Sequence, residues 1–183
     1  LGGEDALDTA ARGLLEHVRA TGSVDYWGVR TLKDRVLRSA FRRFVRHEWG
    51  SGSDRARRLR SFISEQAWWL DDYALYRAAQ HQAGGQPWTA WPAAFRDHER
   101  AARAAFRRES AQEILFRQYL QWLAHGQWLE ARQQSTGLRV SGDFPFGVAA
   151  DSADVWANQR LFSFDGAVGE PHDAFSANGQ NWQ

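Results

Sequence analysis

The chain opens with two stretches in which apolar residues recur at helical spacing. The first covers about residues 4–20, and Gly22 follows it as a stop signal. The second begins after Asp25, whose carboxylate is suited to cap a helix, and its apolar stripe runs to Phe44. Residues 50–53 then break the pattern. We therefore predict two amphipathic helices that pack against a shared partner.

The helical pattern continues up to residue 135. A third helical region begins at Ser53 or the next residue and extends to about residue 82. Residues 84–92 hold two glycines, two prolines and two tryptophans, and a proline disfavours α geometry in the residue before it, so we predict an aromatic loop. Short helical pieces over residues 95–108 and one long helix over residues 109–135 follow.

The pattern changes after Gly137. Residues 138–142 favour a β-strand, a helical turn is expected near residues 151–157, and a second strand is expected over residues 161–164. The acids and serine at 151–154 are better suited to cap that short helix than to bind a ligand. Because a lone strand leaves its edge groups unpaired, we expect its sheet partners to lie outside this sequence.

Asp143 stands where the first predicted strand ends, between Gly142 and Pro145. At the carboxyl end of a barrel strand such an acid would face the reacting side of the fold. An aspartate beside glycine and proline can equally be a turn residue that accepts local N–H bonds. The pattern alone leaves both interpretations open.

Composition narrows the class of protein. The 183 residues are 43 % hydrophobic, carry a net charge of +1 and include neither cysteine nor methionine. The balanced charge argues against nucleic-acid binding, and the sequence has neither an apolar run that would span a membrane nor a signal-peptide pattern. No histidine pair has metal-ligand spacing on a helix, so we propose no metal site. Lacking an initial methionine and ending inside a motif, the sequence is expected to be a piece of a longer polypeptide.

Three segments near the carboxyl end carry a family resemblance: SGDFPFGVA at 141–149, DSADVWA at 151–157 and VGEPHDAFSANGQNW at 168–182. Upstream, WWLDDYAL at 68–75 and the tryptophans at 88, 91, 122 and 128 continue it. In these motifs the chain resembles the 4-α-glucanotransferases, also called amylomaltases or disproportionating enzymes, of glycoside hydrolase family 77.

The resemblance implies an α/β fold. This sequence would be a mostly helical fragment of a (β/α)8 TIM barrel, with a helical insertion over residues 1–136 and a barrel strand with a glucan-binding loop over residues 137–183. The parent enzyme would act in the cytoplasm without a cofactor and transfer α-1,4-glucan segments between maltooligosaccharides by a retaining double displacement. Its oligomeric state is left open.

The resemblance also implies which residues contact glucan. Asp143 would lie near the cleavage site, and the loop would contribute the side chains Asp173, Phe175, Ser176, Gln180 and Trp182. Aromatic faces suit the apolar face of a pyranose, and carboxylates and amides suit its hydroxyls. By contrast, the tryptophans at 68, 69, 122 and 128 lie in helical stripes and are interpreted as packing residues.

The sequence departs from the family pattern in its loop. His172 stands where a second proline is common, Ala174 where many members have an aromatic, Ala177 where some have an acid, and Gln183 where glycine is usual. These departures bear on the rigidity of the loop and on its acceptor preference.

The family's catalytic acids are not in this sequence. They lie in motifs resembling Arg-x-Asp-His, Glu-Asp-x-Gly and Thr-His-Asp, and none of these occurs here, so the nucleophile and the acid/base are expected beyond Gln183. The fragment alone is expected to be inactive. Two alternatives remain open: a non-catalytic α-glucan-binding module, and a helical interaction domain in which the tryptophans only pack.

Overall fold

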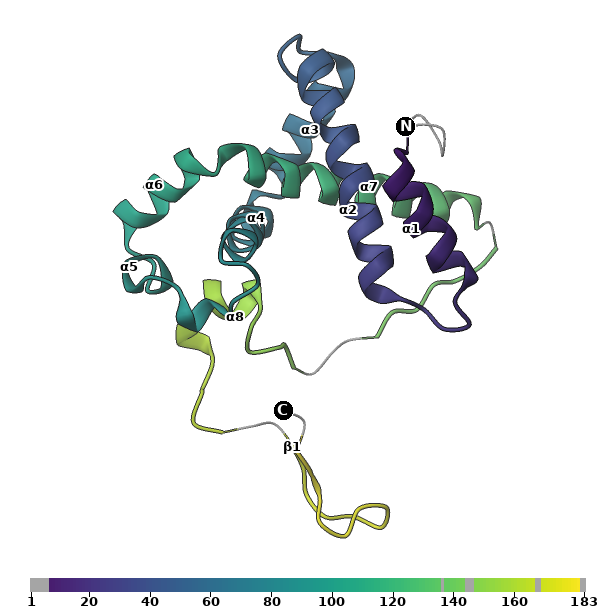
Figure 1. Cartoon of the computed structure of the whole chain (residues 1–183). Helices are drawn as coiled ribbons and strands as arrows, with labels where there is room; N and C mark the ends of the chain where they lie inside the picture. The colour runs from purple at the N-terminus through teal and green to yellow at the C-terminus, as the bar shows by residue number, and fades with distance from the viewer. Residues whose placement is uncertain (1–6, 136, 144–146, 167–168, 182–183) are drawn as a thin grey trace. The chain divides into compact units, whose positions relative to one another are not determined.

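A computed structural model describes residues 7–135, 137–143, 147–166 and 169–181. These residues are mostly helical, as predicted, and include one two-stranded antiparallel sheet (Figure 1). The elements in chain order are α1 (Thr9–Ala20), α2 (Tyr26–Phe44), the π-helical turn η2 (Val45–Trp49), α3 (Asp54–Glu65), α4 (Ala67–Gln82), the 3₁₀ turn η3 (Trp88–Ala90), α5 (Ala93–Arg96), α6 (Arg100–Glu109), α7 (Ala111–Gln134), α8 (Ala153–Ala157), the 3₁₀ turn η4 (Gln159–Leu161), β1 (Gly169–Glu170) and β2 (Gln180–Asn181).

The chain forms two compact units. The first unit combines Leu1–Ala67 with Leu115–Ala131, and the second combines Trp68–Ile114 with Arg132–Gln183. Each unit has its own cluster of buried hydrophobic residues. The predicted glucan-contacting residues that the structure describes all belong to the second unit.

Side-chain caps start the first three helices. Asp8, Asp25 and Ser53 each accept a hydrogen bond from the backbone N–H three residues further on, at 2.9, 2.9 and 3.2 Å. Such a bond satisfies one of the N–H groups that a helix leaves without an internal partner. The cap predicted at Asp25 is confirmed, and of the two starts predicted for the third helical region Ser53 is the cap, whereas the first helix begins at Thr9, later than predicted.

Aromatic rings fill the core of the first unit. Phe41 and Phe44 of α2 pack against Phe116 and Tyr119 of α7, with ring centroids 5.2 Å apart for Phe41 and Phe116 and 5.1 Å apart for Phe44 and Tyr119. Leu59 of α3 is fully buried in the same cluster. The apolar stripe predicted for the second helix therefore does face a shared core.

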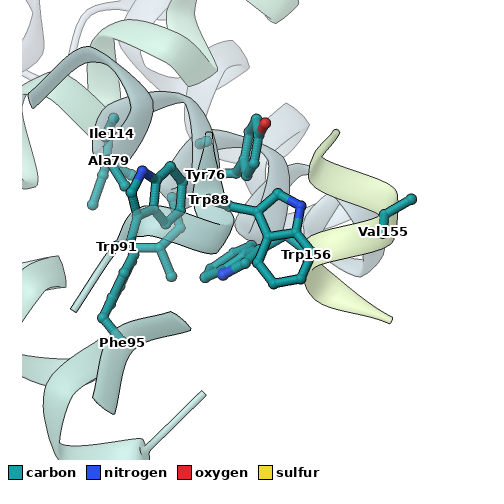
Figure 2. Packing of buried hydrophobic residues seen from close by; sticks show 11 residues of the cluster. Tyr76, Ala79, Trp88, Trp91, Phe95, Ile114, Val155 and Trp156 are labelled. Atoms are coloured by element: carbon teal, nitrogen blue, oxygen red, sulfur yellow. The ribbon is translucent and has the colours of Figure 1, made fainter. Parts of the chain in front are cut away.

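The core of the second unit is built around Trp156 of α8, which is 0 % exposed. Figure 2 shows its indole beside Tyr76 and Trp91, and Figure 1 shows α8 beside α4. The ring centroids of Tyr76, Trp91 and Phe95 lie 6.0, 5.9 and 5.4 Å from that of Trp156. Tilted aromatic contacts at such separations are favourable beyond the area that they bury.

Three predicted elements differ in the structure. The helix expected from residue 53 to residue 82 ends at Glu65 and restarts at Ala67, because α3 packs into the core of the first unit and α4 into that of the second. No strand forms over the described residues 137–143, nor over residues 161–164, where η4 ends at Leu161. A strand requires a hydrogen-bonded neighbour, and the described residues offer neither segment one.

The tryptophan predictions are partly wrong. Trp68 is 82 % exposed and Trp128 is 52 % exposed, so neither packs as predicted. Trp69 and Trp122 are half-buried, Trp69 against Tyr73 and Trp122 against the core of the first unit. The buried tryptophans also include those at 88 and 91, from the predicted loop, because η3 turns both indoles into the core of the second unit.

Candidate functional site

A β-hairpin carries four of the six predicted glucan-contacting residues. Its strands β1 and β2 pair antiparallel, with Gly169 opposite Asn181 and Glu170 opposite Gln180. Between them, Asp173 Oδ1 accepts hydrogen bonds from the backbone N–H groups of Phe175 and Ser176, at 2.9 and 2.6 Å. An aspartate that binds the backbone two and three residues ahead imposes a local turn. The loop is therefore ordered by its own carboxylate.

The hydroxyl of Ser176 tightens the other side of the same loop. Its Oγ donates to the carbonyl oxygen of Gly179 at 2.8 Å, and the Gly179 N–H donates to the carbonyl oxygen of Ser176 at 3.2 Å. The Asp173 N–H also reaches that Ser176 carbonyl, at 3.0 Å. The side chains of Asp173 and Ser176 thus both form hydrogen bonds with the backbone of their own loop.

Gly179 is required by the hairpin for two reasons. Its φ is +68°, in the left-handed region that glycine adopts at little cost, and a Cβ there would lie 2.5 Å from the carbonyl oxygen of Glu170. A Cβ on Gly169 would lie 2.3 Å from the carbonyl oxygen of Gln180. Both glycines allow the two strands to approach closely enough to pair.

Phe175 is a large apolar residue that the hairpin presents to solvent. Its side chain is 97 % exposed, although its backbone N–H is held by Asp173. A large apolar ring held this way can cover the apolar face of a ligand at a small additional entropic cost. Gln180 of β2 is also exposed, and its amide can both donate and accept hydrogen bonds.

The other two predicted site residues, Asp143 and Trp182, are not among the described residues of this hairpin. Asp143 is exposed and follows a segment without regular secondary structure, and no hydrogen bond among the described residues joins it to the hairpin. Trp182 lies outside the described residues. The structure therefore brings Asp173, Phe175, Ser176 and Gln180 into one hairpin, while the association of Asp143 and Trp182 with it stays a prediction.

Asp151 fastens the segment downstream of Asp143 to the core of the second unit. Its Oδ1 accepts a hydrogen bond from the Tyr76 hydroxyl at 2.8 Å and another from the Trp88 backbone N–H at 3.1 Å. The Trp88 indole N–H donates to the carbonyl oxygen of Ala150 at 2.8 Å. These three bonds, which we call the Asp151 clasp, join residues 150–151 to α4 and η3.

Electrostatics favour the donor role of Tyr76 in the clasp. Burial raises the pKa of the Tyr76 phenol well above its usual range, and the hydrogen bond to Asp151 raises that pKa further. The phenol consequently remains protonated, and able to donate, throughout the neutral range.

The short helix α8 follows the clasp directly. Ser152 Oγ accepts the Val155 N–H at 3.3 Å and caps the helix, so the predicted capping role of this segment is confirmed for Ser152. At the other end, the carbonyl oxygen of Trp156 lies 2.6 Å from His98 Nε2, and because a carbonyl only accepts, Nε2 is the donor. The adjacent ring nitrogen, Nδ1, accepts from Arg103, which also pairs with Asp72.

The whole chain resembles one known protein family. A family model of glycoside hydrolase family 77, described as 4-alpha-glucanotransferase, matches residues 5–183. The chain belongs to this family. The family likeness thus extends over both units and over every predicted site residue.

Individual family members agree with this assignment. The 4-alpha-glucanotransferase of Thermus thermophilus is 38 % identical over 169 residues, which are 88 % of this chain and 33 % of that protein. The Synechocystis 4-alpha-glucanotransferase is 35 % identical over 87 % of this chain and 33 % of its own length. The chain therefore spans about a third of these 4-alpha-glucanotransferases.

A solved structure is similar in fold. The amylomaltase from Streptococcus agalactiae in complex with acarbose superposes with a TM-score of 0.76 at 28 % sequence identity, over 94 % of this chain and 37 % of that one. The arrangement of helices described above is thus shared with an amylomaltase.

The clasp and the His98 contact were not predicted from the sequence of this 4-alpha-glucanotransferase family member. Asp151 had been interpreted with its neighbours as a helix cap, and its partners Tyr76 and Trp88 lie 75 and 63 positions away. Local spacing holds no signal for such contacts. His98 had one indirect signal, since it adjoins an acid and precedes a helix, but its left-handed φ of 66° is visible only in the structure.

Among the described residues, no group of three or more His, Asp or Glu side chains is arranged to hold a metal ion. In the same part of the chain, no helix combines the length and the apolar character needed to cross a membrane.

Proposed function

We propose that the chain is part of a 4-α-glucanotransferase that transfers α-1,4-glucan segments from one maltooligosaccharide to another. The family match over nearly all of the chain supports this, as does the similarity to an amylomaltase that binds acarbose, a maltooligosaccharide analogue. Because the chain spans about a third of its relatives, the activity is proposed for the longer polypeptide rather than for these residues alone.

In this proposal the chain supplies a segment of a (β/α)8 barrel. Residues 1–136 form the helical insertion, and residues 137–183 form a barrel strand followed by the glucan-binding loop. The backbone of residues 138–143, which has no regular secondary structure here, would become a barrel strand once neighbouring strands are present, because each strand then satisfies the edge of the other. Asp143 would then lie at the carboxyl end of that strand, on the side where barrel enzymes bind substrate.

The proposed chemistry is retaining. A carboxylate nucleophile attacks the anomeric carbon, the C–O bond to the leaving glucan breaks, and an acid/base carboxyl about 5 Å away protonates the departing oxygen. The 4-hydroxyl of a second glucan then attacks the anomeric carbon of the covalent intermediate and loses its proton to the acid/base carboxylate. The bond between the sugar and the nucleophile breaks, which frees the nucleophile and leaves a new α-1,4 bond. The three family motifs that carry these acids do not occur in the chain, so its residues bind and orient glucan and do not perform the transfer.

The observation that carries the proposal is the ordered hairpin with Phe175 at its surface. An exposed ring on a loop fixed by Asp173 and Gly179 can cover the apolar face of a pyranose. Ser176 and Gln180 lie in the same hairpin and offer hydrogen-bonding groups for sugar hydroxyls. The contacts of the Asp173 carboxylate give that residue a second role, since it shapes the loop as well as facing solvent.

The test uses the product of the whole reading frame that contains these 183 residues. Phe175→Ala should lower kcat/KM for maltotriose by about tenfold, the size of one lost aromatic contact with its buried area. Leu161→Ala is the matched control, because Leu161 is an 80 % exposed apolar side chain outside the hairpin. Equal rates for Phe175→Ala and the unmodified polypeptide would show that the hairpin is not the glucan site. Glucan binding by a polypeptide with no turnover would instead identify a non-catalytic binding module.

A further inference from the structure

We propose that Asp151 is a positioning residue, which through Tyr76 and Trp88 holds residues 147–150, downstream of Asp143, in place for glucan transfer. The inference rests on the proposed function and adds to it a role for the helical part of the chain. It assigns to the Asp151 clasp an effect on turnover, beyond any effect on stability.

The clasp joins an exposed segment to a rigid base. Tyr76 is 2 % exposed and Trp88 is 5 % exposed, and both belong to the core around Trp156. Residues 147–150, immediately before Asp151, are exposed, and Asp143 lies eight positions before Asp151. A displacement of Asp151 would therefore move the exposed segment while the buried rings stay in contact with one another.

The clasp also lies close to the segment that joins α8 to the hairpin. The ring of Trp88 lies 6.0 Å from that of Phe164, which follows α8 and precedes the hairpin. Trp88 thus contacts the chain on both sides of α8, at residues 150–151 before it and at Phe164 after it. The Trp88 side chain and the Asp151 carboxylate therefore hold the chain against the core just before α8, and Trp88 also contacts it just after α8.

The identity of the acid matters to this geometry. Asp151 Oδ1 accepts two hydrogen bonds at once, and a charged acceptor makes each bond stronger than a neutral one would. Asparagine keeps an oxygen in the same place without the charge, whereas alanine leaves the Tyr76 hydroxyl and the Trp88 N–H without this partner. Aspartate, asparagine and alanine at position 151 are therefore expected to hold the Tyr76 hydroxyl and the Trp88 N–H with decreasing strength.

The experiment measures steady-state disproportionation of maltotriose by the product of the whole reading frame. Asp151→Ala should lower kcat/KM by at least about tenfold, mostly through kcat, because sub-ångström misplacement near the cleavage site costs transition-state stabilisation more than ground-state binding. Asp151→Asn should retain activity within about threefold of the unmodified polypeptide, since it keeps the acceptor. Rates are taken at a temperature at which circular dichroism shows every variant to be folded.

The matched control is Asp154→Ala. Asp154 lies in the first turn of α8 and is exposed, so this variant loses an aspartate from the same short segment without opening the clasp. Its kcat/KM should stay within about twofold of that of the unmodified polypeptide.

Tyr76→Phe keeps the result interpretable if Asp151→Ala fails to fold, because it retains the ring packing and removes one donor of the clasp. It should lower kcat/KM by about threefold or more, and the Tyr76→Phe, Asp151→Ala double variant should be no slower than Asp151→Ala alone.

If both single variants keep kcat/KM within twofold of the unmodified polypeptide, whatever their melting temperatures, Asp151 has no positioning role. If the unmodified polypeptide itself does not disproportionate maltotriose, the proposed function fails, and this inference fails with it.

Discussion

Removing the indole of Trp156 should be among the most destabilising single changes in the second unit. The side chain is 0 % exposed and contacts the rings of Tyr76, Trp91 and Phe95. A fully buried tryptophan removes about 250 Å² from water, which at ~25 cal/mol/Å² gives an upper bound of about 6 kcal/mol. Because truncations of buried aromatics usually cost ~3–5 kcal/mol, we expect Trp156→Ala to lower the free energy of unfolding by about 4 kcal/mol.

The assay is urea unfolding of the chain, followed by far-ultraviolet circular dichroism. Trp68→Ala is the matched control, since Trp68 is 82 % exposed and its truncation should cost at most about 1 kcal/mol. Hydrogen exchange adds a local measurement: Trp156→Ala should reduce amide protection in α4, which packs against Trp156, more than in α2, which belongs to the other unit. If Trp156→Ala and Trp68→Ala shift the unfolding free energy equally, the described core is wrong.

Three further predictions follow from individual contacts. Ser152→Ala should cost about 1 kcal/mol in urea unfolding because α8 loses its cap, whereas Ser152→Gly should cost only a few tenths. Gly179→Ala should abolish the amide protection of β1 and β2, because its Cβ meets the Glu170 carbonyl, while Gly85→Ala, with φ of +86° and nothing within 4 Å, should leave the hairpin intact. Since the folded state raises the pKa of Tyr76, its contribution to stability is complete below about pH 10 and declines as the pH rises further, so Tyr76→Phe should flatten the alkaline fall of the urea midpoint.

Helix starts were predictable from the sequence because a cap is a local arrangement. Asp25 and Ser53 each bind an N–H only three residues away, so composition and position were sufficient. The break at Gln66 was not predictable, because neither glycine nor proline marks it. It exists because α3 and α4 belong to different cores, and this is a property of the tertiary structure.

The tryptophans show the same distinction. Periodicity placed Trp68 and Trp128 on helical stripes, but it does not reveal whether a stripe meets a partner, and both indoles are exposed in the structure. Conversely, Trp88 lies in a glycine- and proline-rich segment that predicts a loop, yet its indole N–H reaches the Ala150 carbonyl and its ring is buried. Burial depends on contacts between distant segments, which a local pattern does not encode.

The candidate site was predictable only through family resemblance. Motif matching identified the hairpin residues, and the structure adds that Asp173 and Ser176 bind the loop's own backbone while Phe175 is left at the surface. The strand predicted before Asp143 could not form within the described residues, because pairing requires neighbours from elsewhere. The place of Asp143 in a barrel stays a prediction.

The most direct test of the proposed glucan transfer is product analysis after the whole reading frame's product is incubated with maltotriose. Transfer of a maltosyl unit converts two maltotriose molecules into glucose and maltopentaose, so the two should first appear in equal amounts while the total number of reducing ends stays constant. A rise in reducing ends equal to the number of bonds cleaved would identify a hydrolase, and unchanged maltotriose would contradict the account altogether.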